Sequence, residues 1–251
     1  MSTEYSGGDV TVSLRLLWGL DERPSRGPKP SLTVDKIAAA GIELADEEGL
    51  DALSMRRVAA KLGVGTMSLY RYVPSKAELI DVMLDRAIAS EDTFNHMSGL
   101  EGKGWREKMH AIAHASRELY LRHNWLLHVS PVRRLLGPGA LASFEYFLDV
   151  MAETTLTDAE KINTIGLIDG YVISATKSVI EAAQAAERTG VSDEDYWEAH
   201  RPFLEQILAT GDYPNMVSMA PGTFEEAIAT SFDYGLDRVL DGLELLINSR
   251  K

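Results

Sequence analysis

Residues 53–76, LSMRRVAAKLGVGTMSLYRYVPSK, decide the fold of this chain. The stretch holds five basic residues and no acidic one, although the whole chain of 251 residues carries a formal net charge of -13. Net charge of that sign argues against a nucleic-acid partner, but the distribution of charge matters more than its sum. A helix-patterned segment without carboxylates indicates a surface that faces negative charge.

Two short helices are predicted within this stretch. The first turns Val58 and Ala59 toward a core and ends at Gly63, which can adopt the left-handed conformation of a helix C-terminus. The second is anchored from behind by Leu69 and Val73, which are four residues apart.

Capping residues predict the neighbouring helices. Thr33 is a helix N-cap ahead of an apolar face that ends near Gly49. Ser54 caps the helix of the basic stretch, and Ser75 with Glu78 forms a capping box that begins a fourth helix. Three short helices in succession, with a glycine-containing turn between the second and third, form a helix-turn-helix.

The outward face of the third helix carries small, hydroxyl, aromatic and basic side chains. Such side chains suit a DNA major groove, where they reach base edges, thymine methyl groups and phosphate oxygens. Basic residues at the starts of the second and fourth helices are placed where helix N-termini meet phosphates. A plain three-helix packing unit with a solvated basic face is the alternative that spacing and charge leave open. The predicted DNA-contacting residues are Arg56, Arg57, Thr66, Met67, Ser68, Tyr70, Arg71, Tyr72 and Lys76.

The remainder of the chain is also predicted to be helical. Capping boxes are predicted at Thr157 to Glu160 and at Thr223 to Glu226. No convincing alternating strand pattern is present, so the predicted fold class is all-α. Apolar residues at helical spacing indicate helices at about 104–125, 138–153, 157–188, 193–210 and 222–248.

Negative charge is concentrated in the second part of the chain. Residues 1–90 carry 11 Lys and Arg against 13 Asp and Glu, a net charge of -2, whereas residues 91–251 carry 14 against 25, a net charge of -11. The acidic part is expected to discourage nonspecific wrapping by DNA.

A second acid-free run, RPSRGPKPSLTV, lies ahead of the helix-turn-helix. Its Arg23, Arg26 and Lys29 are predicted to add phosphate or minor-groove contacts. Prolines interrupt this run, so residues 1–30 are expected to form a flexible arm. Within the arm, VTVSLRLLWGL at residues 10–20 has the apolar content of a short helix.

Several classes of function are disfavoured by what the sequence lacks. Without cysteine there are no disulfides, thiolate metal sites or cysteine nucleophiles. No secretory signal or transmembrane run is apparent, which fits a cytoplasmic protein without a membrane partner. His110 and His114 share one helix face, as metal ligands often do, but the glutamate of a zinc-protease motif is missing, and a role in a pocket wall or in packing is favoured. No cofactor, metal or catalytic residue is therefore predicted.

The helix-turn-helix resembles the N-terminal domain of the TetR family of bacterial transcription regulators over about residues 30–90. The matching residues are Glu48-Gly49-Leu50, the small-apolar run 58–64, Ser68-Leu69-Tyr70-Arg71-Tyr72-Val73, and Lys76 followed by Glu78-Leu79. Gly65 and Val73 depart from the family pattern, which often has Ser and Phe there. Residues 91–251 resemble, more loosely, the C-terminal domain of the tetracycline repressor branch.

The resemblance implies a ligand-responsive repressor that a small molecule releases from a palindromic double-stranded operator. It implies a cytoplasmic homodimer with a DNA-binding domain at residues 31–90 and a ligand-binding and dimerisation domain at residues 91–251. An all-helical enzyme, a metal-dependent or small-molecule-binding protein, or a pure interaction module with a non-functional helix-turn-helix is the alternative.

The sequence gives only a broad prediction of the ligand pocket. Large residues on the middle helices suggest a largely apolar effector with a few polar handles, whose identity is not readable. These residues serve equally well as ordinary core. The candidate pocket residues are Trp105, His110, His114, Tyr120, Trp125, Phe144, Phe147, Met151, Ile168, Tyr171 and Trp197.

Overall fold

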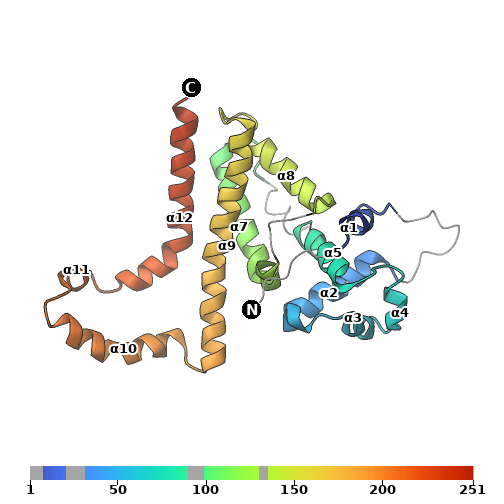
Figure 1. Ribbon diagram of the computed structural model, residues 1–251. Coiled ribbons are helices and arrows are strands. Elements are labelled where there is room, and N and C mark those ends of the chain that lie inside the picture. The colour runs from blue at the N-terminus through green and yellow to red at the C-terminus, as the bar shows by residue number, and fades with distance from the viewer. Residues whose placement is uncertain (1–7, 21–31, 90–98, 130–134, 251) are drawn as a thin grey trace. The chain divides into compact units, whose positions relative to one another are not determined.

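The computed structural model describes residues 8–20, 32–89, 99–129 and 135–250, and the regular elements in these ranges are helices (Figure 1). The predicted all-α fold class is therefore confirmed. The chain divides into two compact units, Met1–Asp169 and Gly170–Lys251. No helix in the described ranges is both long and apolar enough to cross a membrane.

Four helices of the first unit form the predicted helix-turn-helix and its supports. Val58 and Leu69 are fully buried, so the apolar spacing of the sequence corresponds to the core side of these helices. Gly63 has φ +67° at the turn, a conformation that L side chains rarely adopt. The four helices are α2 (Val34–Glu48), α3 (Met55–Lys61), α4 (Thr66–Leu69) and α5 (Lys76–Ile88).

The predicted helix starts in this region are confirmed by their hydrogen bonds. The hydroxyl of Thr33 accepts the backbone N–H of Lys36 at 3.2 Å. The hydroxyl of Ser54 accepts the backbone N–H of Arg57 at 3.3 Å. Each bond satisfies one of the unpaired donors at a helix N-terminus, which fixes where the helix begins.

An additional helix, α1 (Val10–Leu17), precedes these four. Asp9 caps α1, since its carboxylate accepts the backbone N–H groups of Thr11 at 2.8 Å and Val12 at 3.2 Å. Leu17 is buried, and α1 packs against α5. Part of the expected flexible arm is therefore a docked helix, the short helix that the apolar content of residues 10–20 suggested.

The first unit continues beyond the expected domain boundary at residue 90, because α5 packs against α8 and α2 packs against η2. Asp85 of α5 links the two regions, since its carboxylate accepts the backbone N–H groups of Gly139 at 3.1 Å and Ala140 at 3.0 Å in the first turn of α8. The further elements are η1 (Leu50–Ala52), α7 (Trp105–Arg122), η2 (Asn124–His128), α8 (Pro138–Val150) and the start of α9 (Asp158–Thr189).

The second unit contains the rest of α9 and three more helices. The Tyr171 hydroxyl on α9 donates to the backbone oxygen of Phe232 at 2.7 Å, which ties α9 to α12. Leu236 and Leu240 of α12 are fully buried. The three helices are α10 (Asp193–Leu208), α11 (Pro214–Val217) and α12 (Thr223–Asn248).

One of the two predicted capping boxes in the later helices is wrong. Thr157 and Glu160 form theirs, with the Thr157 backbone N–H donating to the Glu160 carboxylate at 2.8 Å. At α12 the N-cap is Gly222, with φ +82°, and the Thr223 hydroxyl instead donates to the backbone oxygen of Ala220 at 2.7 Å. The left-handed glycine moves the start of the helix by one residue, and Thr223 is then inside the helix.

Candidate nucleic-acid interface

The outward side of α4 is open to solvent. Met67 is 74% exposed and Tyr70 is 42% exposed, whereas Leu69 and Val73 behind them are fully buried. Thr66, Ser68 and Tyr72 are part-exposed. The core side chains hold the short helix in place, and the side chains predicted to read DNA remain accessible.

Two arginines flank this face without a carboxylate partner among the residues that the structure describes. Arg56 lies at the start of α3 and Arg71 follows α4, and both are exposed. A guanidinium that is not engaged in an ion pair can bind a phosphate in bidentate fashion without first exchanging a partner. Arg56 and Arg71 are therefore the best-placed cations on the interface.

Arg57 is held differently, although the sequence placed it among the DNA contacts. Its guanidinium forms an ion pair with the Glu48 carboxylate at the end of α2, and a longer bond of 3.5 Å reaches the backbone oxygen of Ala52. The hydrogen bond from Arg57 lowers the pKa of Glu48, and the same bond raises the pKa of Arg57. Arg57 thus ties α3 to α2.

Lys61 and Lys76 also have partners within the protein. Lys61 lies 3.2 Å from carboxylate oxygens of both Glu43 and Glu47, and its hydrogen bonds to Glu43 and then Glu47 raise its pKa. The Lys76 ammonium donates to the backbone oxygen of Leu50 at 3.4 Å. Of the five basic residues in the acid-free stretch, two therefore face acids on α2.

The predicted arm contacts Arg23, Arg26 and Lys29 lie outside the described residues.

The helices around the helix-turn-helix are joined to the later helices by a polar cluster that the sequence did not predict. The Asp46 carboxylate on α2 lies 2.8 Å from Nδ1 of His123 and accepts the indole N–H of Trp125 at 2.8 Å. Trp125 is fully buried. This residue, a candidate for the pocket, therefore contacts α2.

Three buried carboxylates line one side of α5: Glu78, Asp81 and Asp85. Buried acids require donors, and distant ones come from Asp9 and Ser13 at α1 for the first two and from the first turn of α8 for the third. The available sequence signal is the pair of aspartates inside the apolar run LIDVMLDRAI, where solvent-facing positions are few. Only tertiary structure reveals their donors.

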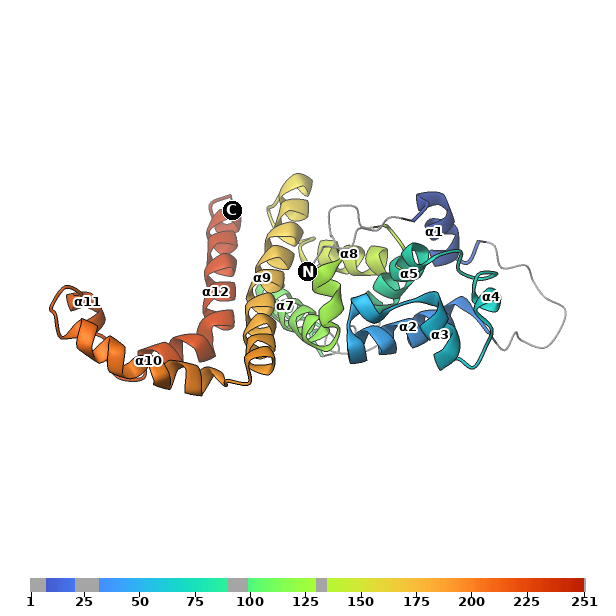
Figure 2. The same ribbon diagram turned by 60° about the horizontal axis from the view of Figure 1, so that its bottom comes forward.

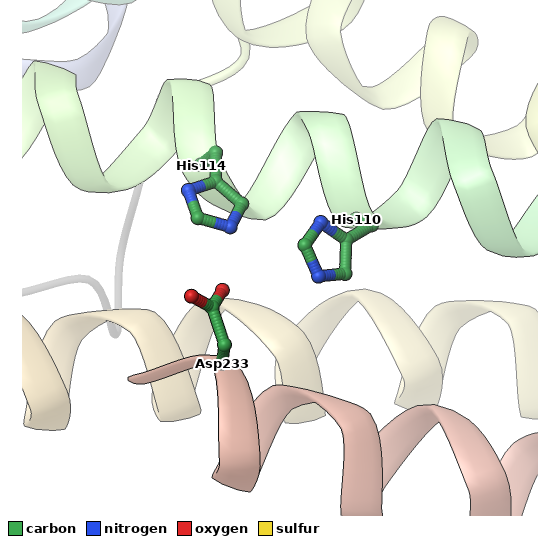
Figure 3. A group of neighbouring side chains, drawn as sticks. All are labelled: His110, His114 and Asp233. Carbon is green, nitrogen blue, oxygen red and sulfur yellow. The ribbon is translucent and has the colours of Figure 1, made fainter. Parts of the chain in front are cut away.

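The candidate pocket residues are distributed over both units. On α7, His110 and His114 stack at 4.8 Å between ring centroids, and Figure 3 shows both imidazoles on the same side of that helix. Trp105, Phe144 and Phe147 are part-buried, whereas Tyr120, Met151 and Ile168 are buried. Tyr171 is tied to α12, and Trp197 on α10 is 59% exposed.

These features are typical of a helix-turn-helix DNA-binding protein with a further helical region. They are the exposed outer face of the short helix α4, the two accessible arginines, and the capped helices around the turn. The chain matches the family model "Bacterial regulatory proteins, tetR family" over residues 33–83. It matches the model "Tetracyclin repressor-like, C-terminal domain" over residues 98–247. The chain belongs to the TetR family.

Relatives agree with this assignment. The chain is 47% identical to the HTH-type transcriptional repressor DrrR1 of Streptomyces coeruleorubidus, over all of this chain and 92% of the relative. It is 32% identical to the HTH-type transcriptional repressor Rv1353c of Mycobacterium tuberculosis, over 91% of this chain and 85% of the relative. The crystal structure of ActR from Streptomyces coelicolor in complex with actinorhodin superposes with a TM-score of 0.69 and 26% identity, covering 88% of this chain and 99% of ActR. The family and the relatives identify the chain as a transcriptional regulator rather than an enzyme.

Proposed function

We propose that the protein acts as a cytoplasmic homodimer that binds a palindromic operator and is released by a largely apolar small molecule. The observation that carries the DNA-binding part is the exposure of Met67 and Tyr70 on a helix whose rear side chains are fully buried. In a dimer, two such helices enter successive major grooves about 34–36 Å apart.

The proposed DNA contacts divide by chemistry. Tyr70 and Arg71, with their smaller neighbours Thr66 and Ser68, reach base edges and the adjacent phosphates, and the Met67 side chain offers an apolar contact to thymine methyl groups. Arg56 and Lys76 at two helix starts bind phosphates. Tyr72 lies beside this face. Arg57 reaches a phosphate only by exchanging Glu48, and Arg23, Arg26 and Lys29 contribute from the arm.

Apolar side chains on the second unit support the homodimer. Phe224, Ile228 and Leu245 of α12 are exposed, as are Val179 of α9 and Phe203 of α10. A monomer rarely exposes this many large apolar groups, and a second copy of the chain can cover them. In size-exclusion chromatography with light scattering we expect twice the mass of 27.6 kDa, and Leu245→Glu is expected to reduce the dimer fraction.

The effector site is proposed to lie within residues 91–251. The crystal structure of ActR with actinorhodin supports a small-molecule effector for this chain. The site is proposed to draw on the candidate residues named above, His110 and His114 among them. Release requires that the effector bind more tightly to the arrangement of the protein that does not bind DNA. Operator DNA must then weaken effector binding by the same factor by which the effector weakens operator binding.

Selection from random double-stranded DNA tests the function directly. The purified protein is expected to enrich a palindrome, and fluorescence anisotropy then gives its affinity at several salt concentrations. Tyr70→Ala and Arg71→Ala are expected to lower affinity for the palindrome far more than for random DNA, with exposed Glu145→Ala on α8 as the control. A protein that enriches no sequence, or variants with unchanged selectivity, would contradict the proposal.

A further inference from the structure

Helix α1 lies outside both segments matched by the family models, residues 33–83 and 98–247. The helix packs on α5, and the two are side by side in both views (Figures 1 and 2). Helix α5 begins two residues after Pro74 and carries Lys76 in its first turn. A helix outside the family models therefore rests on the helix that follows the DNA-reading element.

The first bond between α1 and α5 is made by Glu78. One oxygen of its buried carboxylate accepts the backbone N–H of Asp9 at 3.0 Å, and the other oxygen bonds the Ser75 hydroxyl. Ser75 in turn caps α5 by accepting the backbone N–H of Ala77 at 3.1 Å. A single carboxylate therefore joins the residue that caps α1 to the residue that caps α5.

The second bond lies one turn further along α5. The hydroxyl of Ser13, which is fully buried, donates to Oδ2 of Asp81 at 2.6 Å, and Asp81 is buried as well. A short bond from a hydroxyl to a buried carboxylate is charge-assisted and stronger than a neutral one. It sets the position of α1 along α5, because a shift of one residue would separate the two groups.

One end of α1 is held by a close approach of backbone to a side chain, and the other by a hydrogen bond. A β-carbon added to Gly8 would come within 2.8 Å of a Glu78 carboxylate oxygen and 3.1 Å of the Ser13 hydroxyl, so a side chain there would have to displace the Glu78 carboxylate. At the other end, the Trp18 indole N–H donates to the backbone oxygen of Leu136 at 3.1 Å, just before α8. Helix α1 thus contacts both α5 and the segment that leads into α8.

We propose that α1 is a positioning element for DNA binding. Ser13 and the close approach at Gly8 hold the first two turns of α5, and with them α4, in the orientation that fits the operator. The inference rests on the proposed function. Without the donors of α1, the buried carboxylates Glu78 and Asp81 each lose a hydrogen bond, the start of α5 is held less firmly, and the population with a correctly oriented α4 falls. Apparent affinity for the operator falls in proportion to that population.

The test uses full-length Ser13→Ala and Gly8→Val, with Thr11→Ala on the exposed side of α1 as the matched control. Operator affinity is measured by anisotropy well below the unfolding temperature of every variant, beside affinity for random DNA. Ser13→Ala is expected to weaken operator binding about three- to tenfold, the factor that one net hydrogen bond carries, and Gly8→Val at least as much. Random-DNA binding and the Thr11→Ala control should not change.

Amide hydrogen exchange supplies a readout that separates positioning from general stability. Residues 76–80 and α4 are expected to exchange faster in Ser13→Ala, while α12 is unaffected. Equal operator affinity in wild type, Ser13→Ala and Gly8→Val would overturn the inference and leave the proposed function intact. A general loss of stability without a change in operator selectivity would also overturn it. A wild-type protein that selects no operator would instead contradict the proposed function itself.

Discussion

The Asp46 carboxylate of α2 accepts the indole N–H of Trp125 at 2.8 Å, and so a DNA-binding helix is bonded to a fully buried side chain of the later sequence. His123 Nδ1 lies 2.8 Å from the same carboxylate oxygen. His123 and Trp125 therefore share one acceptor, which lies more than seventy residues before them in the chain.

Replacing Asp46 with Ala is expected to lower the free energy of unfolding by about 1–3 kcal/mol, because the buried indole N–H loses its acceptor. Asp46→Asn keeps a carbonyl oxygen for Trp125 and should cost less. Urea denaturation followed by circular dichroism measures both. If the two variants were equally stable, the bond to Trp125 would not be the source of the effect.

Asp85→Ala removes the cap of α8 and the buried partner of Arg86. The carboxylate bonds two backbone N–H groups of α8 and lies 3.0 Å from the Arg86 guanidinium, which has a second partner in Asp35. We expect a loss of about 2–4 kcal/mol in unfolding free energy. Glu145→Ala on the exposed side of α8 is the control, and a similar loss there would argue against a specific role for Asp85.

Arg56→Ala and Arg57→Ala are expected to differ in the salt dependence of their operator affinity. Arg56 is exposed, whereas Arg57 is paired with Glu48. Losing one phosphate contact per subunit makes the negative slope of log affinity against log salt less steep by about 1.8 for a dimer. Arg56→Ala is expected to show that decrease and Arg57→Ala little of it. A decrease of the same size for Arg57→Ala would mean that DNA displaces Glu48.

Glu78 gives a prediction about pH. Burial on its own raises the pKa of Glu78, but the Ser75 hydroxyl and the backbone N–H groups of Glu78 and Asp9 stabilise the carboxylate, and the net effect lowers the pKa below its usual 4.5. A carboxyl group with a lowered folded-state pKa contributes stability above its unfolded pKa and loses it as pH falls through the folded value.

The stability difference between wild type and Glu78→Gln should therefore be largest above about pH 4.5 and shrink below it. Thermal unfolding of both proteins across this range is the measurement. A difference that stayed constant with pH would show that the charge of Glu78 does not stabilise the fold.

The local signals in the sequence predicted the helices well. The hydroxyls of Thr33 and Ser54 cap the helices that they were expected to cap, and Gly63 adopts the left-handed turn. These features depend on a few neighbouring residues, so a sequence pattern contains them. The predicted capping box at Thr223 was wrong because Gly222, in a left-handed conformation, is the N-cap instead. The sequence pattern alone does not show which of the two residues begins the helix.

Partners distant in the chain were not predictable. Arg57 fits a phosphate contact by position, but the pairing with Glu48 depends on how α3 lies against α2. Trp125 fits a pocket wall by size, yet its indole N–H bonds Asp46. The distant donor to Glu78 is the backbone N–H of Asp9, which caps a helix that the apolar content of residues 10–20 only suggested.

Gly137 and Gly139 bring the start of α8 close to Asp85 of α5: a β-carbon on Gly137 would overlap the Asp85 carboxylate, and one on Gly139 would overlap the Asp85 backbone oxygen. Backbone in direct contact, with a carboxylate bonded across it, allows little sliding of one helix over the other. A displacement of the first turn of α8 must then carry α5 with it rather than be absorbed by rearranging side chains. Movement is passed directly from α8 to α5 because the contact between Gly139 and Asp85 is made by backbone atoms and a bonded carboxylate.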